Sequence, residues 1–488
     1  MAAVYLGVDV GTTELKMAVI EAGRGKVLAK ASQRIRTHEA PDGTREQNAE
    51  DMIQSLQRVS VSLRRDLGQR WKTIEGIGFA AQGGSAMIVD RSTGEPFTPL
   101  QLWSDTRPLA LLPEIASRRP KGYWRRISRT EGPGHGLARM EWLRRQYPAY
   151  MPPVGRETDT RYCGIGEYIG FRLTGEWRQD PGNALQMGCY SVRGKKLVRG
   201  PLDTVGVPLS FVSPLREGHE IHPLTSEGAS LLGLSQGIQV AGPYIDHEAG
   251  YLSCAGVTKR PLQCSLGTAW VGNFVVQGDP SPFDGLDLIL PSPVKDGSLV
   301  LRVMLAGNAS WDWGLRTLLG TGKKVSMSRL LKRAEDVFSE ALLPPRGLVA
   351  SPWLTRPNPF IGGSLGNGSF QGVGALTTRA QMLRALVAAM CFEFAIQFEA
   401  VRDHKLVDEV ILGGGASQGS WFQTVLTGLF HPLPVRVVEA GDPSGARGAI
   451  YAFSHKAARS PVRSIPPPRG NVLSAIQEQL QIYKESCP

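Results

Sequence analysis

One short pattern occurs twice in this chain, once in each half, and it constrains the fold more than any other feature. The first copy covers residues 8–13 and the second covers residues 264–269. In each copy a small apolar strand meets Gly-Thr, and a second strand follows. The backbone amides and threonine hydroxyls of such a turn form a nest for phosphate oxygens. The repetition therefore predicts two related α/β halves that hold one polyphosphate.

The two copies differ at one chemically important position, where Asp9 in the first copy is replaced by Ser265 in the second. A carboxylate at a strand end can reach a Mg²⁺ ion that bridges phosphates, so only the first half is predicted to face a metal. The other interpretation of Asp9 is a turn-capping residue. Lys16, on the strand that leaves the first turn, is either a phosphate contact or an exposed lysine paired with a carboxylate.

Length and composition indicate two domains in a compact enzyme. A chain of 488 residues with 42% hydrophobic residues is too long for one ordinary core, and we place the boundary between residues 1–256 and 257–488. The 57 glycines and 20% charged residues are typical of a loop-rich α/β enzyme. The net charge of +11 is dispersed, with clusters no larger than pairs such as Arg125-Arg126 and Lys323-Lys324. No nucleic-acid-binding motif accompanies them, so no nucleic-acid partner is expected.

Cysteine usage and hydropathy favour a cytoplasmic protein that does not enter a membrane. The six cysteines, of which Cys487 is the last, form no CxxC pair and no metal-binding pattern, so reduced thiols are expected. No leader peptide is expected before the first strand. The most apolar predicted helix, over 380–401, is interrupted by Arg384, Glu393 and Glu399 and is interpreted as a buried core helix.

The N-terminal region predicts three strands, one helix and two further strands in that order. Three antiparallel strands precede a helix that Asn48 can cap, and its apolar residues follow at helical spacing. Strands are expected over 74–81 and 86–90. The Pro- and Gly-rich region 108–240 is predicted to elaborate the first domain and to shape a substrate cleft.

Asp246 is the leading candidate for acid–base chemistry. It lies between an apolar strand end and the start of a helix rich in small residues, where a carboxylate could accept the proton of an attacking hydroxyl. The alternative is a helix N-cap. His247 and Glu248, which follow directly, make a polar site more plausible at this point.

A glycine-rich turn over 413–416 supports two interpretations, a flat surface for an adenosine or a packing turn between strand and helix. The same region matches G-x-S-x-G at 415–419, the nucleophile elbow of α/β-hydrolases, and Asp442 and His455 follow in the order of a triad. His455, however, lies in a predicted helix over 448–458, and a hydrolase leaves the repeated Gly-Thr turns unexplained.

These patterns together resemble the FGGY family of carbohydrate kinases, which includes xylulokinase, glycerol kinase, gluconokinase and ribulokinase. The resemblance covers nearly the whole chain. The segments that carry it are Gly7 to Thr13 with Lys16, Trp103 to Arg107, Phe171 to Trp177 with Asp180, Ser265 to Thr268, Phe370 to Val373 with Arg384, and Gly414 to Ala416 with Trp421.

The resemblance implies an α/β fold of two duplicated actin-like ATPase (ribonuclease H-like) domains with a nucleotide cleft between them. It implies an ATP-dependent kinase that phosphorylates a hydroxyl of a small sugar, ketose or polyol with the help of Mg²⁺. The implied catalytic base is Asp246. The implied nucleotide contacts are Thr12, Thr13, Lys16, Gly267, Thr268, Gly307, Gly414 and Gly415. The implied substrate contacts are Gln82, Gly84, Trp103, Asp105, Asp246 and His247, and the implied metal contacts are Asp9 and Asp246.

Three departures from the family pattern bear on substrate and nucleotide. Glu14 replaces a small hydroxyl residue near the phosphate turn, Gln82-Gly83-Gly84 stands where xylulokinases carry Gln-Met-His, and His247 stands where many members carry Gln or Asn. Glycines at 83 and 84 predict a roomier pocket, or one that depends more on backbone groups and His247. A non-catalytic or filament-forming actin-like ATPase is the second hypothesis, and a homodimer remains open.

Overall fold

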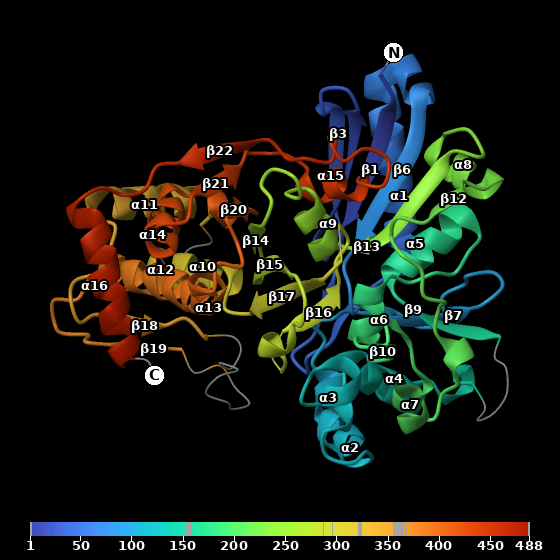
Figure 1. The fold of residues 1–488 in the computed structure, drawn as a ribbon, viewed down its shortest axis with the longest axis horizontal. Coiled ribbons are helices and arrows are strands. Elements are labelled where there is room, and N and C mark those ends of the chain that lie inside the picture. The colour runs from blue at the N-terminus through green and yellow to red at the C-terminus, as the bar shows by residue number, and fades with distance from the viewer. Residues whose placement is uncertain are drawn as a thin grey trace. The chain divides into compact units, whose positions relative to one another are not determined.

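The computed structural model describes residues 2–152, 159–285, 287–294, 296–320, 325–354, 366 and 368–486. Within these ranges the chain divides into two compact units, drawn in Figure 1. The first unit comprises Met1–Val257, Val275–Val300 and Pro443–Ser460; the second comprises Thr258–Phe274, Leu301–Asp442 and Pro461–Pro488. The first unit thus takes two segments from the second half of the sequence. Lys323, Lys324 and Cys487 lie outside the described residues.

The first unit is built on a six-stranded sheet with the order β12-β13-β6-β1-β2-β3. These strands are β1 (Val4–Val10), β2 (Glu14–Glu21), β3 (Lys26–Arg34), β6 (Ile74–Ala81), β12 (Ile221–Pro223) and β13 (Gln239–Ile245). Strands β1, β2 and β3 are antiparallel neighbours, as predicted, whereas β1, β6 and β13 run parallel. The carboxyl ends of β1, β6 and β13 therefore meet at one edge of the sheet.

Helices cover both faces of this sheet. Because successive strand residues point to opposite faces, Leu6 and Val8 join the core formed with α1 (Ala49–Leu67), α5 (Ile165–Thr174) and α8 (Ser226–Leu232). Helix α1 begins at the predicted cap, since the Asn48 side chain accepts hydrogen bonds from the Glu50 and Asp51 amides. The opposite face packs against α9 (Asp246–Leu252) and α15 (Ser444–Ala449).

A separate hydrophobic cluster takes most of its residues from the Pro- and Gly-rich region. Its elements are β7 (Met87–Asp90), α2 (Leu112–Ser117), α3 (Tyr123–Ser128), α4 (His135–Gln146), β9 (Thr160–Cys163), α6 (Pro181–Met187), β10 (Tyr190–Ser191), β11 (Lys196–Leu197) and α7 (Arg199–Thr204). Three short strands, β4 (His38–Glu39), β5 (Arg45–Gln47) and β8 (Leu100–Gln101), form a separate small sheet. The predicted elaboration therefore has a core of its own, although α5 and α8 belong to the main sheet.

In the second half of the chain, a seven-stranded sheet with the order β16-β17-β15-β14-β20-β21-β22 repeats the strand–turn–strand pattern. These strands are β14 (Pro261–Leu266), β15 (Trp270–Val276), β16 (Leu288–Pro291), β17 (Ser298–Met304), β20 (Glu409–Gly413), β21 (Val435–Val438) and β22 (Val462–Ile465). Strands β18 (Val349–Ser351) and β19 (Ser369–Gln371) form a separate two-stranded sheet. The helices are α10 (Asn308–Leu318), α11 (Met327–Glu340), α12 (Arg379–Ile396), α13 (Glu399–Asp403), α14 (Ser420–Phe430) and α16 (Asn471–Ser486).

Two predicted helices differ in extent from the observed ones. The core helix expected over 380–401 is divided into α12 and α13, and α12 is buried along most of its length, as predicted. The helix expected over 448–458 is wrong, because α15 ends at Ala449 and turns follow it. Those turns carry Ala457 and Ala458 into the core beneath β2, so tertiary packing outweighs helix propensity here.

The five described cysteines are buried and free of disulfides. In the part of the chain that the structure describes, no helix is long and apolar enough to cross a membrane.

Candidate active site

The two candidate carboxylates lie at the same edge of the first-unit sheet. Asp9 is paired with Ala80 of β6, and Ile245, which precedes Asp246, is paired with Ala81 of the same strand. The parallel register therefore places both aspartates beside the end of β6. The Asp246 carboxylate accepts a hydrogen bond from the His247 amide at 2.9 Å, and its side chain is 32% exposed. Asp246 does not act as the N-cap of α9, because that position belongs to Ile245.

Four neighbouring side chains influence the pKa of Asp9. Burial raises the pKa of Asp9 to about 6, while Lys16 and His247 lower it and Asp246 and Glu14 raise it further. Part of the Asp9 surface remains exposed, although protein atoms surround its carboxylate. No hydrogen bond to this carboxylate is found among the described residues. The Asp9 carboxylate is therefore buried without a hydrogen-bond donor from those residues, and the electrostatic effects of Lys16 and His247 offset part of the effect of burial.

The donors of the first hairpin are exposed, and the acid next to them has its own partners. Thr13 and Lys16 are exposed on the turn and on β2. Glu14 accepts a hydrogen bond from the Ser32 hydroxyl at 2.6 Å and lies 3.8 Å from the Lys16 ammonium. Glu14 is thus paired along the hairpin with Ser32 and Lys16, which offsets the negative charge it brings near the turn.

Thr12 connects the hairpin to the predicted sugar loop. Its hydroxyl donates to Gln82 at 2.9 Å and accepts from the Trp103 indole at 3.0 Å. Gln82 is 3% exposed, donates to Gln47 and also accepts from Ser85. The polar atoms of Gln82 are therefore used to hold neighbouring segments, and one hydrogen-bonded chain joins three of the predicted site residues.

Asp105 is also committed to protein partners. Its carboxylate accepts hydrogen bonds from the Arg45 amide at 3.0 Å and from the Arg107 guanidinium at 2.7 Å, and the side chain is fully buried. Arg107 reaches Glu46 as well, at 2.5 Å. This ion-pair network ties the segment that follows Trp103 to Arg45 and Glu46 of β5, and it occupies the Asp105 carboxylate.

The loop after β6 is packed against α6. The Gly84 amide donates to the Asn183 side chain at 3.2 Å, and a methyl group at Gly83 or Gly84 would overlap the Gln186 amide. The expectation of a roomier pocket is therefore wrong, because Gln186 fills the space that larger residues at 83 and 84 would occupy. Sequence reasoning missed Gln186, since nothing in its local pattern shows which loop it faces.

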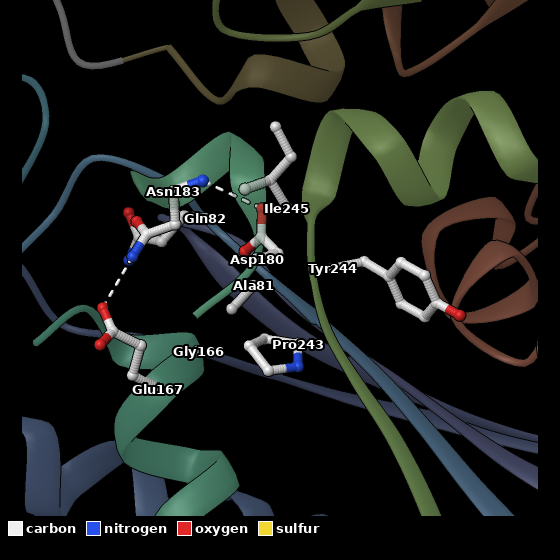
Figure 2. Close-up of a pocket in the computed structure, with 9 residues that line it drawn as sticks. All are labelled: Ala81, Gln82, Gly166, Glu167, Asp180, Asn183, Pro243, Tyr244 and Ile245. Atoms are coloured by element: carbon white, nitrogen blue, oxygen red, sulfur yellow. Dashed lines mark hydrogen bonds between the residues drawn. The ribbon is translucent and has the colours of Figure 1, made fainter. Parts of the chain in front are cut away.

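Behind this loop lies a small cavity, shown in Figure 2. Asn183 lies between two buried acids. Its backbone N–H donates to the Asp180 carboxylate at 3.0 Å, and its side-chain nitrogen donates to the Glu167 carboxylate at 2.7 Å. Tyr244 points away from the cavity in this view. The space open to the centre of a water molecule is about 10 Å³, enough for one water and too small for a sugar.

Helix α15 is the element that sequence reasoning did not assign to the site. A Cβ at Gly445 would overlap the Asp9 carboxylate, and one at Gly448 would overlap the Ala249 carbonyl of α9. On the sheet itself, Gly7 and Gly78 leave room for the backbone of α15 in the same way. These glycines allow α15 to pack against Asp9 and against α9, the helix that begins at Asp246. The small residues at 445 and 448 were the available signal.

In the second unit, the predicted nucleotide residues converge on the repeated turn. Gly307 packs against the backbone of Thr268 and Trp270, where a Cβ would approach to 2.8 Å. Gly414, at φ +88°, lies against the backbone of Leu266, and only glycine tolerates both that conformation and that contact. Thr268, Gly414 and Gly415 are exposed, and the Gly267 carbonyl accepts a hydrogen bond from the Asn308 amide. Three segments far apart in sequence thus form one surface of small residues.

The serine of the hydrolase hypothesis is not available as a nucleophile. Ser417 is fully buried, and its hydroxyl donates to the Gly414 carbonyl at 2.7 Å. His455 instead stacks on Tyr451, with the ring centroids 4.1 Å apart. The G-x-S-x-G match therefore reflects a strand-to-helix turn.

The residues at the sheet edge fit a divalent cation in their chemistry. Asp9 and Asp246 supply carboxylate oxygens, the ligands that Mg²⁺ prefers, and Asp9 lacks a hydrogen-bond donor from the described residues. Within those residues, no cluster of three or more His, Cys, Asp or Glu side chains could hold a metal by itself. An ion at this edge would therefore keep several waters or use phosphate oxygens.

Comparison with known proteins shows the family of this chain. The family model described as "FGGY family of carbohydrate kinases, N-terminal domain" matches residues 4–253, and the corresponding C-terminal domain model matches residues 263–457. A xylulose kinase of Staphylococcus epidermidis is 23% identical over 92% of this chain and 88% of its own length. A glycerol kinase of Deinococcus radiodurans is 23% identical over 84% of this chain and 81% of its own.

Among solved structures, that of xylulose kinase from Rhodospirillum rubrum is similar in fold, with a TM-score of 0.82 and 19% identity. The similarity covers 99% of this chain and 98% of that one.

Proposed function

This chain belongs to the FGGY family of carbohydrate kinases, ATP-dependent phosphotransferases with the actin-like fold, and from that premise we propose how it works. We propose that it transfers the γ-phosphoryl group of ATP to a hydroxyl of a small sugar, ketose or polyol, with Asp246 as the general base. The observation that carries the proposal is the sheet edge itself, where a partly exposed Asp246 lies beside the hairpin that contains Asp9.

In the proposed reaction, Asp246 accepts the proton of the acceptor hydroxyl while that oxygen attacks the γ-phosphorus. The bond from the γ-phosphorus to the bridging oxygen breaks, and ADP leaves. A positioned base of this kind contributes on the order of 10² to 10⁴ in rate. Trp103 and His247 would orient the acceptor, and Gln82 and Asp105 would support the loop through the contacts described above.

For the nucleotide, we propose that the exposed donors Thr13 and Lys16 and the turn at Thr12 bind phosphate oxygens. The surface formed by Gly267, Thr268, Gly307, Gly414 and Gly415 would bind the remaining phosphates and the adenosine. Asp9 and Asp246 would hold Mg²⁺, which when bound neutralises charge on the phosphate oxygens. The exposure of Thr13, Lys16 and Thr268 supports this assignment.

A coupled assay of ADP release tests the proposal. The purified protein, with Mg²⁺ and ATP, is offered pentuloses, pentitols, tetritols and hexonates in separate reactions. Release of ADP that depends on one acceptor, with one phosphorylated product per ADP, is the expected result. ADP release that no acceptor stimulates would instead support the alternative of a filament-forming actin-like ATPase and would overturn the proposed transfer to a hydroxyl.

A further inference from the structure

Helix α6 presents two amide side chains to the loop after β6. Asn183 and Gln186 are three residues apart, so they lie on the same face of the helix. The Asn183 side-chain oxygen accepts a hydrogen bond from the Gly84 amide at 3.2 Å, which fixes the loop against the helix. Gln186, one turn further along, reaches the same loop with a longer side chain.

The Gln186 amide occupies the space above two consecutive glycines. A Cβ at Gly83 would overlap its Nε2 atom, and a Cβ at Gly84 would overlap its Oε1 atom. The amide group therefore lies along the backbone of both residues. Gly84 has φ +74°, which also disfavours any other residue there. The side-chain amide of Gln186 thus occupies the space that side chains at positions 83 and 84 would otherwise fill.

The surroundings of this amide are those of the proposed acceptor site. The Cβ position of Gly83 is 3.2 Å from Ile245, the residue before Asp246, and the Cβ position of Gly84 is 3.4 Å from Trp103. Gln186 is half-buried. Among the described residues no hydrogen bond of its amide is found, in contrast to Gln82, Gln47 and Asn183 nearby. The side-chain amide of Gln186 therefore has both its donor and its acceptor available to a ligand.

We infer that Gln186 is a specificity-determining residue, whose side-chain amide hydrogen-bonds hydroxyl groups of the sugar or polyol. The inference rests on the proposed function, since it names a further contact of the same acceptor site. An amide offers one oxygen acceptor and two N–H donors, which suits a pair of neighbouring hydroxyls. Gln186 thus supplies from α6 the polar contact that Gly83 and Gly84 cannot make.

The test compares four variants in the acceptor-dependent kinase assay. Gln186→Leu keeps the approximate volume and removes the hydrogen-bonding atoms. Gly83→Ala adds a methyl group where the amide nitrogen lies, and Gly83→Ala/Gln186→Ala relieves that overlap. Gln146→Leu, at the exposed end of α4, is the matched control, because it makes the same change away from the loop. For each variant, kcat/KM is measured for the best acceptor and for its monodeoxy analogues, together with the KM for ATP.

Gln186→Leu is expected to lower kcat/KM for the best acceptor by about 10-fold or more, because a site built to bind a hydroxyl loses its partner. The KM for ATP should not change. For the deoxy analogue that lacks the contacted hydroxyl, kcat/KM should be the same in wild type and in Gln186→Leu. Gly83→Ala should also lower kcat/KM for the best acceptor. The double variant Gly83→Ala/Gln186→Ala should lose no more than Gln186→Leu does, since the effects of contacting residues are not additive.

A wild-type kcat/KM and an unchanged order of acceptors in Gln186→Leu would overturn the inference while leaving the proposed kinase intact. An equal loss for every acceptor and every deoxy analogue would overturn it as well, since that result indicates a general packing role. If the wild type itself phosphorylates no acceptor, the proposed function fails first, and the two failures are thereby distinguished. If Gln186→Leu does not fold, the order of acceptors is compared between Gly83→Ala/Gln186→Ala, which lacks the amide of Gln186, and Gly83→Ala, which keeps it.

Discussion

At the scale of single residues, Asp246 carries the proposed chemistry, and its replacement is the most direct prediction. Asp246→Asn keeps the shape of the side chain but removes the atom that accepts the proton, so kcat should fall by about 10² to 10⁴. Binding of ATP, measured by equilibrium titration, should stay close to wild type. Asp66→Asn, on the exposed surface of α1, is the control. Retention of more than about a tenth of the wild-type kcat would contradict the role of Asp246 as general base.

Thr268 permits a second residue-scale prediction, in the other unit. Thr268→Val preserves volume and removes the exposed hydroxyl of the repeated turn. The KM for ATP should rise and kcat should fall, with a combined cost of about 1.5 to 3 kcal/mol for a lost hydrogen bond to a charged group. Thr424→Val, whose hydroxyl donates within α14, should leave ATP kinetics unchanged. Unaltered ATP kinetics in Thr268→Val would refute the phosphate role of the repeated turn.

At the scale of elements, helix α15 is predicted to depend on its glycines. Gly448→Ala places a methyl group against the Ala249 carbonyl of α9, and the overpacking should lower the free energy of unfolding by about 1 to 3 kcal/mol. Gly445→Ala meets the Asp9 carboxylate and should reduce kcat more than stability. Gly132→Ala, which has open space around its Cβ and an ordinary φ, is the control. Denaturant melts and kinase assays on the three variants separate the effects. A Gly448→Ala protein as stable as Gly132→Ala would show that the helix can move away.

The loop over 82–84 leads to a prediction about substrates. Gly83 and Gly84 with Gln186 above them present a different set of polar atoms from the Gln-Met-His of xylulokinases, so D-xylulose and glycerol should be poor acceptors. A site that binds a substrate hydroxyl can reject an analogue lacking it by about 10⁴ to 10⁵, which makes such a shift large. The measurement is kcat/KM for both compounds beside the best acceptor of the panel. A value above about 10⁴ M⁻¹s⁻¹ for either compound would disprove this interpretation of the loop.

At the scale of the whole molecule, buried acids make stability depend on pH. Burial raises the pKa of Glu167 to about 7 from its ordinary 4.5, although the hydrogen bond from the Gly164 amide and the charge of Arg161 lower it. The folded protein therefore keeps a proton that the unfolded chain releases, and the free energy of unfolding should fall as pH rises from about 4.5 to about 7. The contribution of Glu167 is on the order of 3 kcal/mol.

Glu167→Gln should flatten this dependence, because the amide is neutral at every pH and its oxygen can still accept from Gly164 and Asn183. Asp180 and Glu248, whose pKa values are also raised by burial, should leave a residual slope. Denaturant melts between pH 5 and pH 8 measure it, with the exposed Glu131→Gln as control. The same slope in Glu167→Gln and wild type would assign the pH dependence to other groups.

A structural feature can be predicted from the sequence when it depends on residues that are neighbours along the chain. The Asn48 cap, the strand over 74–81 and the position of Asp246 between strand and helix follow from neighbouring residues, and the structure has all three. The helix over 448–458 was wrong because burial of Ala457 beneath β2 is not a local property. The functions assigned to the candidate site residues remain predictions.

The sequence by itself determined the order of the elements, the repeated Gly-Thr turns and the family, because strand and helix periodicity and turn chemistry act over a few residues. Tertiary structure decided which distant segments meet. It brought α15 behind Asp9, joined Thr12 to Trp103 through hydrogen bonds, and set Gln186 over Gly83 and Gly84. These contacts depend on the close packing of side chains from segments far apart along the chain, and no local pattern of residues encodes that packing.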